Sequence, residues 1–256
     1  MESTAERNNP LEETDTTATR RHLMRSILLG AAAGLTMAAG AKAQEQGDAR
    51  AQRSSPRAFR DDQQPVPLPF NPSGLKGLSA GLIESHWANN YGGSVRALNE
   101  VNRRLNLALD ESDLPAYVYN DLKREHLMRT GSVVLHELYF ENLGAAGDAT
   151  AALRSSVSAS FGSFDRWETE FRRIAAGLSG GSGWVVLGYN RHLGVLENYW
   201  MADHMHGPVT AEPLLVLDMY EHSYHMDYGA AAARYVDAFF ANINWERVAA
   251  RYEMVG

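Results

Sequence analysis

Apolar residues recur at steps of three and four through two long segments in the first half of the chain. Residues 79–107 and 116–143 both show this spacing, which is typical of helices that bury one face. Gly92 and Gly93 interrupt the first segment, so we expect a tolerated defect in an otherwise long helix. Gly144 follows the second segment and suits a helix C-cap. The pattern predicts a helical hairpin.

The second half of the chain changes from helical spacing to short apolar runs. A third helical segment ends in a stretch of Ser and Gly at residues 179–183. Two runs of β-branched and aromatic residues follow, separated by residues 190–194, which is the pattern of a β-hairpin. The expected elements are a helix over 164–178, strands over 184–189, 195–201 and 214–217, and a closing helix over 235–252. The predicted fold class is α+β: an N-terminal long helical hairpin followed by a C-terminal α/β domain with a small three-stranded antiparallel sheet.

The first 43 residues have the features of an export signal. Arg20 and Arg21 precede an apolar run over 27–39 that is too short, and too rich in Ala and Gly, to span a bilayer. Residues 41–43 give the small-x-small pattern that signal peptidases accept, and the paired arginines resemble the twin-arginine signal. We expect cleavage near Gln44 and export to a bacterial periplasm by that route.

The rest of the chain is expected to hold a tether and two folded parts. Residues 44–65 are polar and show no apolar periodicity, which predicts a flexible tether. The folded part is expected to begin near Leu68, with the helical hairpin domain over 66–147 and the α/β domain over 148–256. The mature chain shows no candidate for a stable membrane span.

Composition narrows the candidate chemistry. The chain has 256 residues, of which 45% are hydrophobic, so it can bury a sizeable core. It has no cysteine, which excludes disulfides, iron–sulfur clusters, thiolate metal sites and cysteine nucleophiles. Any metal must therefore have nitrogen and oxygen ligands. The formal net charge of −7 argues against a nucleic-acid partner, because phosphate binding needs clustered Lys and Arg.

Histidines at selected positions are the strongest candidate ligands. Of nine histidines, His86 and His136 each lie midway along a predicted helix among apolar neighbours. Asp218 and His222 are four residues apart at the end of an apolar run. A single histidine on an apolar face is more often a hydrogen-bonded core residue than a ligand. Only the combination of the four, drawn from three elements, favours a metal site.

Five segments resemble the iron/manganese superoxide dismutases. In chain order they are PLPFNPSGLKGLSAGLIESHWANNYGGSVRALNEVN, GSVVLHELYFENL, GSGWVVLGYN, PLLVLDMYEHSYHMDY and NINWERVAARY. The fourth resembles the specific DxWEHxYxxDY signature, and all five occur in the family's order and spacing over about residues 66–253. The resemblance places the metal ligands at His86, His136, Asp218 and His222.

The resemblance implies that the chain converts superoxide to dioxygen and hydrogen peroxide with one Fe or Mn ion per chain. Three imidazoles and one carboxylate suit a metal that alternates between the +2 and +3 states, and they leave a position for bound water or hydroxide. In the family a Gln or His hydrogen-bonds this solvent, and His204 falls where the histidine variant would, which slightly favours iron. The alternative is that His204 and His206 are ordinary loop histidines. Glu221 is implied to reach the partner's His222 in a homodimer.

The chain departs from the family at the expected substrate entrance. The family usually carries a Tyr eight residues after the first ligand, where this chain has Ser94. A serine hydroxyl still anchors water but leaves a wider and wetter opening. Tyr220 replaces the signature tryptophan and keeps an aromatic wall. Basic entrance residues of the family correspond to Asn89 and Gly229, so an anionic substrate loses electrostatic steering.

A second pair of departures concerns the expected dimer interface. Asn90 replaces the family's histidine four residues after the first ligand, and His225 replaces its tyrosine three residues after the last. In the family these two residues hydrogen-bond each other across the dimer. Because both have changed, we expect a rebuilt contact between Asn90 and His225.

Two other classes of metal enzyme are excluded by spacing. Residues 136–140 begin as the HExxH motif of zinc hydrolases but end in Phe, and the HxD of residues 225–227 has no later histidine to complete an iron oxygenase site. One alternative remains open, an exported metal-binding relative of the dismutases with weak or no activity. A site sealed from solvent past Ser94 would favour that alternative.

Overall fold

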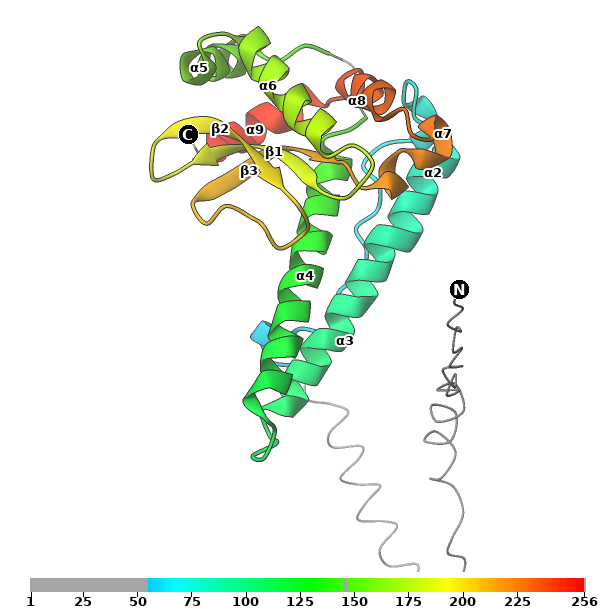
Figure 1. Ribbon diagram of the computed structural model, residues 1–256, viewed down its shortest axis with the longest axis vertical. Helices are drawn as coiled ribbons and strands as arrows, with labels where there is room; N and C mark the ends of the chain where they lie inside the picture. The colour runs from blue at the N-terminus through cyan, green and yellow to red at the C-terminus, as the bar shows by residue number, and fades with distance from the viewer. Residues whose placement is uncertain (1–54, 145–146, 256) are drawn as a thin grey trace, which may run out of the picture. The chain divides into compact units, whose positions relative to one another are not determined.

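The computed structural model describes residues 55–144 and 147–255. In these ranges a helical hairpin precedes a three-stranded antiparallel sheet with helices packed against it, which confirms the predicted fold class (Figure 1). The hairpin consists of α3 (Gly92–Ala108) and α4 (Ala116–Glu141), whose apolar faces pack together. The predicted signal peptide lies outside the described residues.

The helix predicted over 79–107 is divided into three parts. α2 (Ala80–Ser85) leads into a π-helical turn (His86–Tyr91), and α3 follows directly. The defect therefore occupies the turn before Gly92 rather than the glycine pair itself. Wide turns of this kind inside helices are frequent at functional sites, and this one begins at His86.

Part of the segment predicted to be a flexible tether packs along α3. The side-chain amide of Asn99 accepts from the backbone N–H of Gln63 at 3.1 Å and donates to its carbonyl at 2.9 Å. Asn102 donates to the carbonyl of Arg60 at 2.7 Å. Residues 55–65, which were predicted to belong to the flexible tether over 44–65, are therefore part of the folded structure. The sequence pattern missed this because polar side chains of α3 hold the segment, which needs no apolar period of its own.

The predicted strands form one sheet. β1 (Trp184–Asn190) pairs antiparallel with β2 (Val195–Met201) on one side and with β3 (Ala211–Asp218) on the other, in the order β2-β1-β3. The third strand is longer than the predicted 214–217 and ends at Asp218. The central strand β1 is almost wholly buried, so the sheet forms the middle layer of this part of the fold.

A side chain at the end of α4 joins the hairpin to the sheet. Asn142 accepts from the backbone N–H of Val216 at 2.9 Å and donates to the carbonyl of Leu214 at 3.2 Å. These bonds satisfy backbone groups on the outer edge of β3, which has no further strand beside it in the part of the chain that the structure describes. α4 and β3 are thereby held together, and both carry predicted metal ligands.

The helices around the sheet differ from the prediction in two places. The pattern missed the helix after the hairpin, whose only buried apolar residues are Leu153 and Val157 among Ala and Ser. The predicted closing helix is two helices separated by a turn in which Asn242 bonds to the backbone of Lys76. The helices are α5 (Ala151–Phe161), α6 (Phe164–Gly177), α8 (Ala232–Phe240) and α9 (Trp245–Val255). Short turns lie at Arg57–Phe59, Pro72–Gly74, Glu221–Ser223 and, as α7, His225–Tyr228.

Large aromatic side chains fill the core between hairpin, sheet and helices. The most deeply buried include Trp167, Trp184, Tyr139 and Tyr235. Such residues bury much apolar area each, so they contribute strongly to stability. None of the helices in the described part of the chain is sufficiently long and apolar to cross a bilayer.

Candidate metal centre

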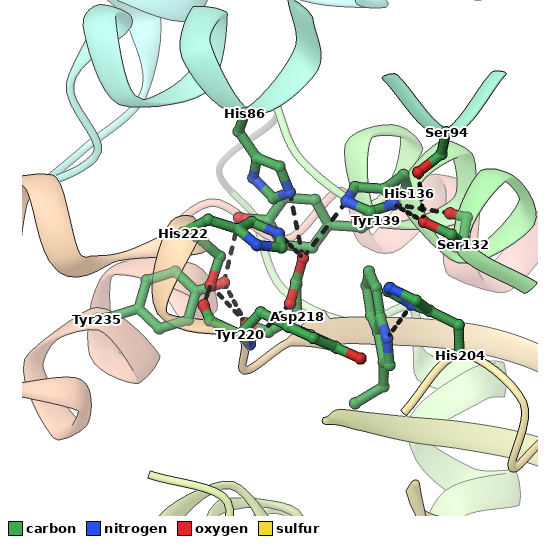
Figure 2. Close-up of polar contacts among 12 residues, drawn as sticks. His86, Ser94, Ser132, His136, Tyr139, His204, Asp218, Tyr220, His222 and Tyr235 are labelled. Atoms are coloured by element: carbon green, nitrogen blue, oxygen red, sulfur yellow. Dashed lines mark hydrogen bonds and ion pairs between the residues drawn. The ribbon is translucent and has the colours of Figure 1, made fainter. Parts of the chain in front are cut away.

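The four predicted ligands meet where the hairpin joins the sheet. His86 begins the π-helical turn, His136 lies within α4, Asp218 ends β3, and His222 lies in the short turn that follows. One donor atom from each residue lies within 4.8 Å of the others. Figure 2 shows the three imidazoles converging on the Asp218 carboxylate.

One carboxylate oxygen lies at the centre of the donor set. Asp218 Oδ2 is 3.1 Å from the Nε2 atoms of both His86 and His222, and 3.7 Å from that of His136. Asp218, His86 and His136 are buried, while His222 is half-buried. Burial alone would raise the pKa of Asp218, but the adjacent His222 and His86 hold it well below its usual range. The carboxylate is therefore charged near neutral pH.

The buried histidines are neutral near pH 7. Burial lowers the pKa of His86, and burial together with the nearby His86 lowers the pKa of His136 to about 3. Neutral imidazoles are the form that binds a metal ion. One charged carboxylate and two neutral imidazoles thus face a common point together with the ring of His222.

This donor set fits a transition-metal ion. Nε2 of His86 and Nε2 of His136 are buried, and their contacts with Asp218 Oδ2 do not have hydrogen-bond geometry, so neither atom has a hydrogen-bond partner among the described residues. Orphaned buried polar atoms are costly, and a metal ion at the point they face would satisfy both. Ligand bonds to such ions are about 2.0–2.2 Å, which brings the donors to separations of the size observed. With neither sulfur nor a second carboxylate, the set suits iron or manganese.

Hydrogen bonds from neighbouring groups hold two of the four ligands, Asp218 and His136. The Asp218 carbonyl accepts from the Tyr235 hydroxyl at 2.7 Å and from Ser223 Oγ at 2.9 Å. Its Oδ1 accepts from the backbone N–H of Tyr220 at 2.8 Å. Nδ1 of His136 lies 2.7 Å from the carbonyl of Ser132, so it donates there and leaves Nε2 for a metal. These bonds orient Asp218 and His136, whereas Nδ1 of His86 has no hydrogen-bond partner among the described residues.

A pocket of about 430 Å³ leads to this centre. It is lined by Asn89, Asn90, Gly93, Ser94, Arg129, Ser132, His136, His204, Tyr220 and His222. The pocket is open rather than sealed, and Ser94 is one of its lining residues, while its role at a substrate entrance stays a prediction. Ser94 itself is buried, and its Oγ lies 2.8 Å from Ser132 Oγ, which links α3 to α4 beside a ligand (Figure 2).

His204 and Tyr220 form one wall of the pocket. Their rings stack with centroids 4.8 Å apart and planes 9° apart, and Tyr220 also stacks on His222. The indole N–H of Trp184 donates to His204 Nδ1 at 2.9 Å. Burial is the main cause that raises the pKa of Tyr220 to about 12, so its phenol stays protonated. By contrast, His206 is exposed and lies 2.8 Å from Asp203.

The residues predicted for a dimer interface lie next to the pocket. Glu221 and His225 are exposed, and Asn90 is half-buried and lines the pocket. Their predicted contacts are with a second copy, so the roles of all three stay predictions. Of the two entrance departures, Asn89 lines the pocket, whereas Gly229 ends α7 in a left-handed backbone conformation with φ of 51°.

Three residues at the centre were missed by the sequence reasoning. Ser132 and Arg129 lie four and seven residues before His136, so helical spacing alone could have placed them on the ligand's face. Trp184 lies in the GSGW segment that marked the family, but its bond to His204 spans a turn and a strand. No sequence signal identifies that pair.

Comparison with known proteins agrees with the geometry. Residues 149–251 match the family model described as iron/manganese superoxide dismutases, C-terminal domain. Superoxide dismutase [Fe] of Cupriavidus metallidurans is 50% identical over 186 residues, which cover 73% of this chain and 94% of the relative. Superoxide dismutase [Fe] of Aquifex aeolicus is 35% identical over 72% of this chain and 88% of its own length. Superoxide dismutase [Mn] 1 of Halobacterium salinarum is 30% identical over 73% and 93%. The chain therefore belongs to the iron/manganese superoxide dismutase family, with a mononuclear iron or manganese site at His86, His136, Asp218 and His222.

Proposed function

We propose that this superoxide dismutase works with iron rather than manganese. The observation that carries dismutase activity is the convergence of three histidine nitrogens and one carboxylate oxygen within 4.8 Å at the end of an open pocket. The bound ion supplies one-electron chemistry, so that one superoxide is oxidised to dioxygen and another is reduced to peroxide. Iron is favoured because the two relatives with the higher identities, 50% and 35%, are both named as iron enzymes.

His204 is proposed to hold solvent in the pocket. Its Nδ1 accepts from Trp184, so the neutral ring carries its proton on Nε2, which remains available to donate. Stacking on Tyr220 fixes the plane of the ring. His204→Gln keeps a donor and should retain much of the rate, whereas His204→Ala should lose about tenfold or more. Equal rates for both variants, at equal metal content, would refute this role.

The remaining open alternative is a metal-binding relative with weak or no activity. The open pocket favours the enzyme, since the substrate entrance past Ser94 is not sealed. To separate the two, we would purify the chain from about Gln44, quantify bound iron and manganese, and follow superoxide decay beside a His222→Ala variant. Roughly one metal per chain with rapid decay, both lost in His222→Ala, supports the dismutase. Bound metal with decay no faster than buffer supports the alternative.

The active form is proposed to be a homodimer. Glu221 and His225 are exposed in the single chain, and both lie within three residues of the ligand His222. A second copy at this surface would cover them and place a carboxylate against the partner's His222. The matched test is the mass in solution of Glu221→Ala beside Glu246→Ala, which alters an exposed glutamate on α9. Dissociation of the first variant alone supports the interface, and an unchanged mass refutes it.

Export through the twin-arginine route is proposed from residues 1–43. The support is the paired Arg20 and Arg21, the short apolar run and the small residues before Gln44. Cell fractionation tests it. Replacing both arginines by lysine should keep the protein in the cytoplasm with its signal uncleaved, and continued export would refute the route.

A further inference from the structure

The pocket that leads to the metal centre contains one permanent charge among its lining residues. Arg129 carries it, and no Asp or Glu is among the described residues that line the pocket. Other polar residues that line the pocket, among them Asn89, Asn90 and Ser94, are neutral. The chain as a whole has a net charge of −7, so its overall charge repels small anions. A cation at this mouth is therefore an exception to the charge of the molecule.

The position of Arg129 follows from helical spacing. It lies three residues before Ser132 and seven before His136 on α4, so the three side chains share one face of the helix. The same face thus carries a metal ligand, a residue that fixes that ligand, and the cation. Arg129 is half-exposed, which is suitable for a group that meets an incoming solute.

One carboxylate opposes this charge. Glu125 lies one helical turn earlier, and its Oε1 accepts from Nε of Arg129 at 2.7 Å and from Nη2 at 2.6 Å. This contact uses only two of the five N–H donors of the guanidinium. Asp203 lies near the opposite wall, and its Oδ1 is 2.8 Å from His206 Nδ1. The charge of Arg129 is therefore reduced by Glu125 but still acts within the pocket.

We propose that Arg129 attracts small anions, superoxide among them, into the pocket, and that Glu125 limits this attraction. The proposal rests on the proposed function, because superoxide is the anion of interest only if the chain is a dismutase. Among the described residues, Arg129 donates hydrogen bonds to Glu125 and to none of the metal ligands. Its proposed role is therefore electrostatic and concerns the approach of the substrate.

The test uses the full chain loaded with ferric iron and azide as a monovalent anion probe. Azide affinity is measured by absorption titration without turnover, and superoxide decay is measured separately as a function of ionic strength. We expect Arg129→Gln to bind azide about two- to fivefold more weakly and Glu125→Gln to bind it more tightly. The decay rate of Arg129→Gln should depend less on salt than that of the unaltered chain. Iron content is checked for each variant.

Two further variants separate charge from shape. Arg104 forms an i,i+4 pair with Glu100 on α3, so Arg104→Gln removes an equal charge and an equivalent contact away from the pocket. It should leave azide affinity unchanged. Arg129→Lys keeps the charge but loses the forked contact, and it should bind azide like the unaltered chain.

The proposal is overturned if Arg129→Gln binds azide normally, if Arg104→Gln weakens azide equally, or if Arg129→Lys behaves like Arg129→Gln. Failure of the proposed function gives a different result, in which the unaltered chain binds azide in an Arg129-dependent way but does not accelerate superoxide decay. That result would support anion attraction by Arg129 and remove the dismutase assignment.

Discussion

The substitution Gly131→Ala tests whether close packing of α4 against the His204 loop positions the pocket wall. A Cβ at position 131 would overlap the carbonyl oxygen of His204 and lie 2.9 Å from its carbonyl carbon. Ordinary contacts of this type begin near 3.4 Å, and the carbonyl oxygen is the closer of the two atoms, so the loop must move by about 1–1.5 Å. The obstacle is backbone rather than a flexible side chain, so a change of rotamer does not relieve it.

The expected cost follows from two opposing terms. Overpacking of this kind costs about 1–3 kcal/mol, whereas alanine in place of glycine inside a helix gains about 0.5–1 kcal/mol. We expect a net loss of about 1–2 kcal/mol, which lowers the midpoint of thermal unfolding by about 2–8 °C in a domain of this size. The shift also strains the 2.9 Å bond from Trp184 to His204, so activity should fall about tenfold while the metal ligands stay in place.

The assay compares unfolding by circular dichroism, iron content and superoxide decay. Gly81→Ala is the matched control, because a Cβ there meets no atom within 4 Å and should leave stability unchanged or raise it slightly. If Gly131→Ala is as stable and as active as Gly81→Ala, the loop is not packed on α4 as described. Loss of iron would equally contradict the reasoning, since the substitution should move His204 and not the ligands.

Three further outcomes are expected. Asn142→Ala leaves the Val216 N–H without its partner, whereas the Leu214 carbonyl keeps the bond from Arg251 Nη1 at 2.9 Å, so chemical denaturation should show a loss of about 1–3 kcal/mol, and a loss below about 0.5 kcal/mol would contradict the edge contact. Tyr235→Phe removes one of two hydroxyl donors to the Asp218 carbonyl, so stability should fall by about 1 kcal/mol while the remaining bond from Ser223 keeps Asp218 in place and iron bound; unchanged stability would contradict the bond. Hydrogen bonds from Arg103 and Arg104 lower the pKa of Glu100 to about 2, so their contribution is present above the unfolded pKa of about 4.5 and is lost as the pH falls towards 2. Glu100→Gln should therefore weaken stability slightly at pH 7 and not at pH 2, and an equal effect at both would refute the linkage.

Sequence reasoning singled out the four residues as candidates because each has a signal along the chain, and the resemblance to the family assigned them to a metal. His86 and His136 are polar residues on otherwise apolar helical faces, and Asp218 and His222 follow a buried strand at a fixed spacing. The hairpin and the sheet were predictable for the same reason, since periodic apolar residues mark both. The structure confirms that these segments bring the four side chains together.

The parts that escaped prediction depend on polar contacts between distant segments. Residues 55–65 are held by Asn99 and Asn102, and the break between α8 and α9 is stabilised by Asn242 bonding to Lys76. Asparagine bonds equally to any exposed backbone, so its partner cannot be derived from spacing. The π-helical turn at His86 is a further case, because the glycines next to it suggested a defect but not its position.

α4 contributes more to the site than its single metal ligand. Along one face this helix presents Arg129, Ser132 and His136, and its Gly131 lets the His204 loop approach from the sheet. A small rotation of α4 would therefore change the metal ligand, its hydrogen bond to Ser132, the charge at the mouth and the position of His204 together. Asn142 opposes such a rotation, because it ties the end of α4 to the backbone of β3, the strand that ends in Asp218. The contacts that stabilise this junction therefore also hold the ligands His136 and Asp218 relative to each other. For this reason we expect the Asn142 contact, although it is distant from the metal, to stabilise the fold around the metal centre.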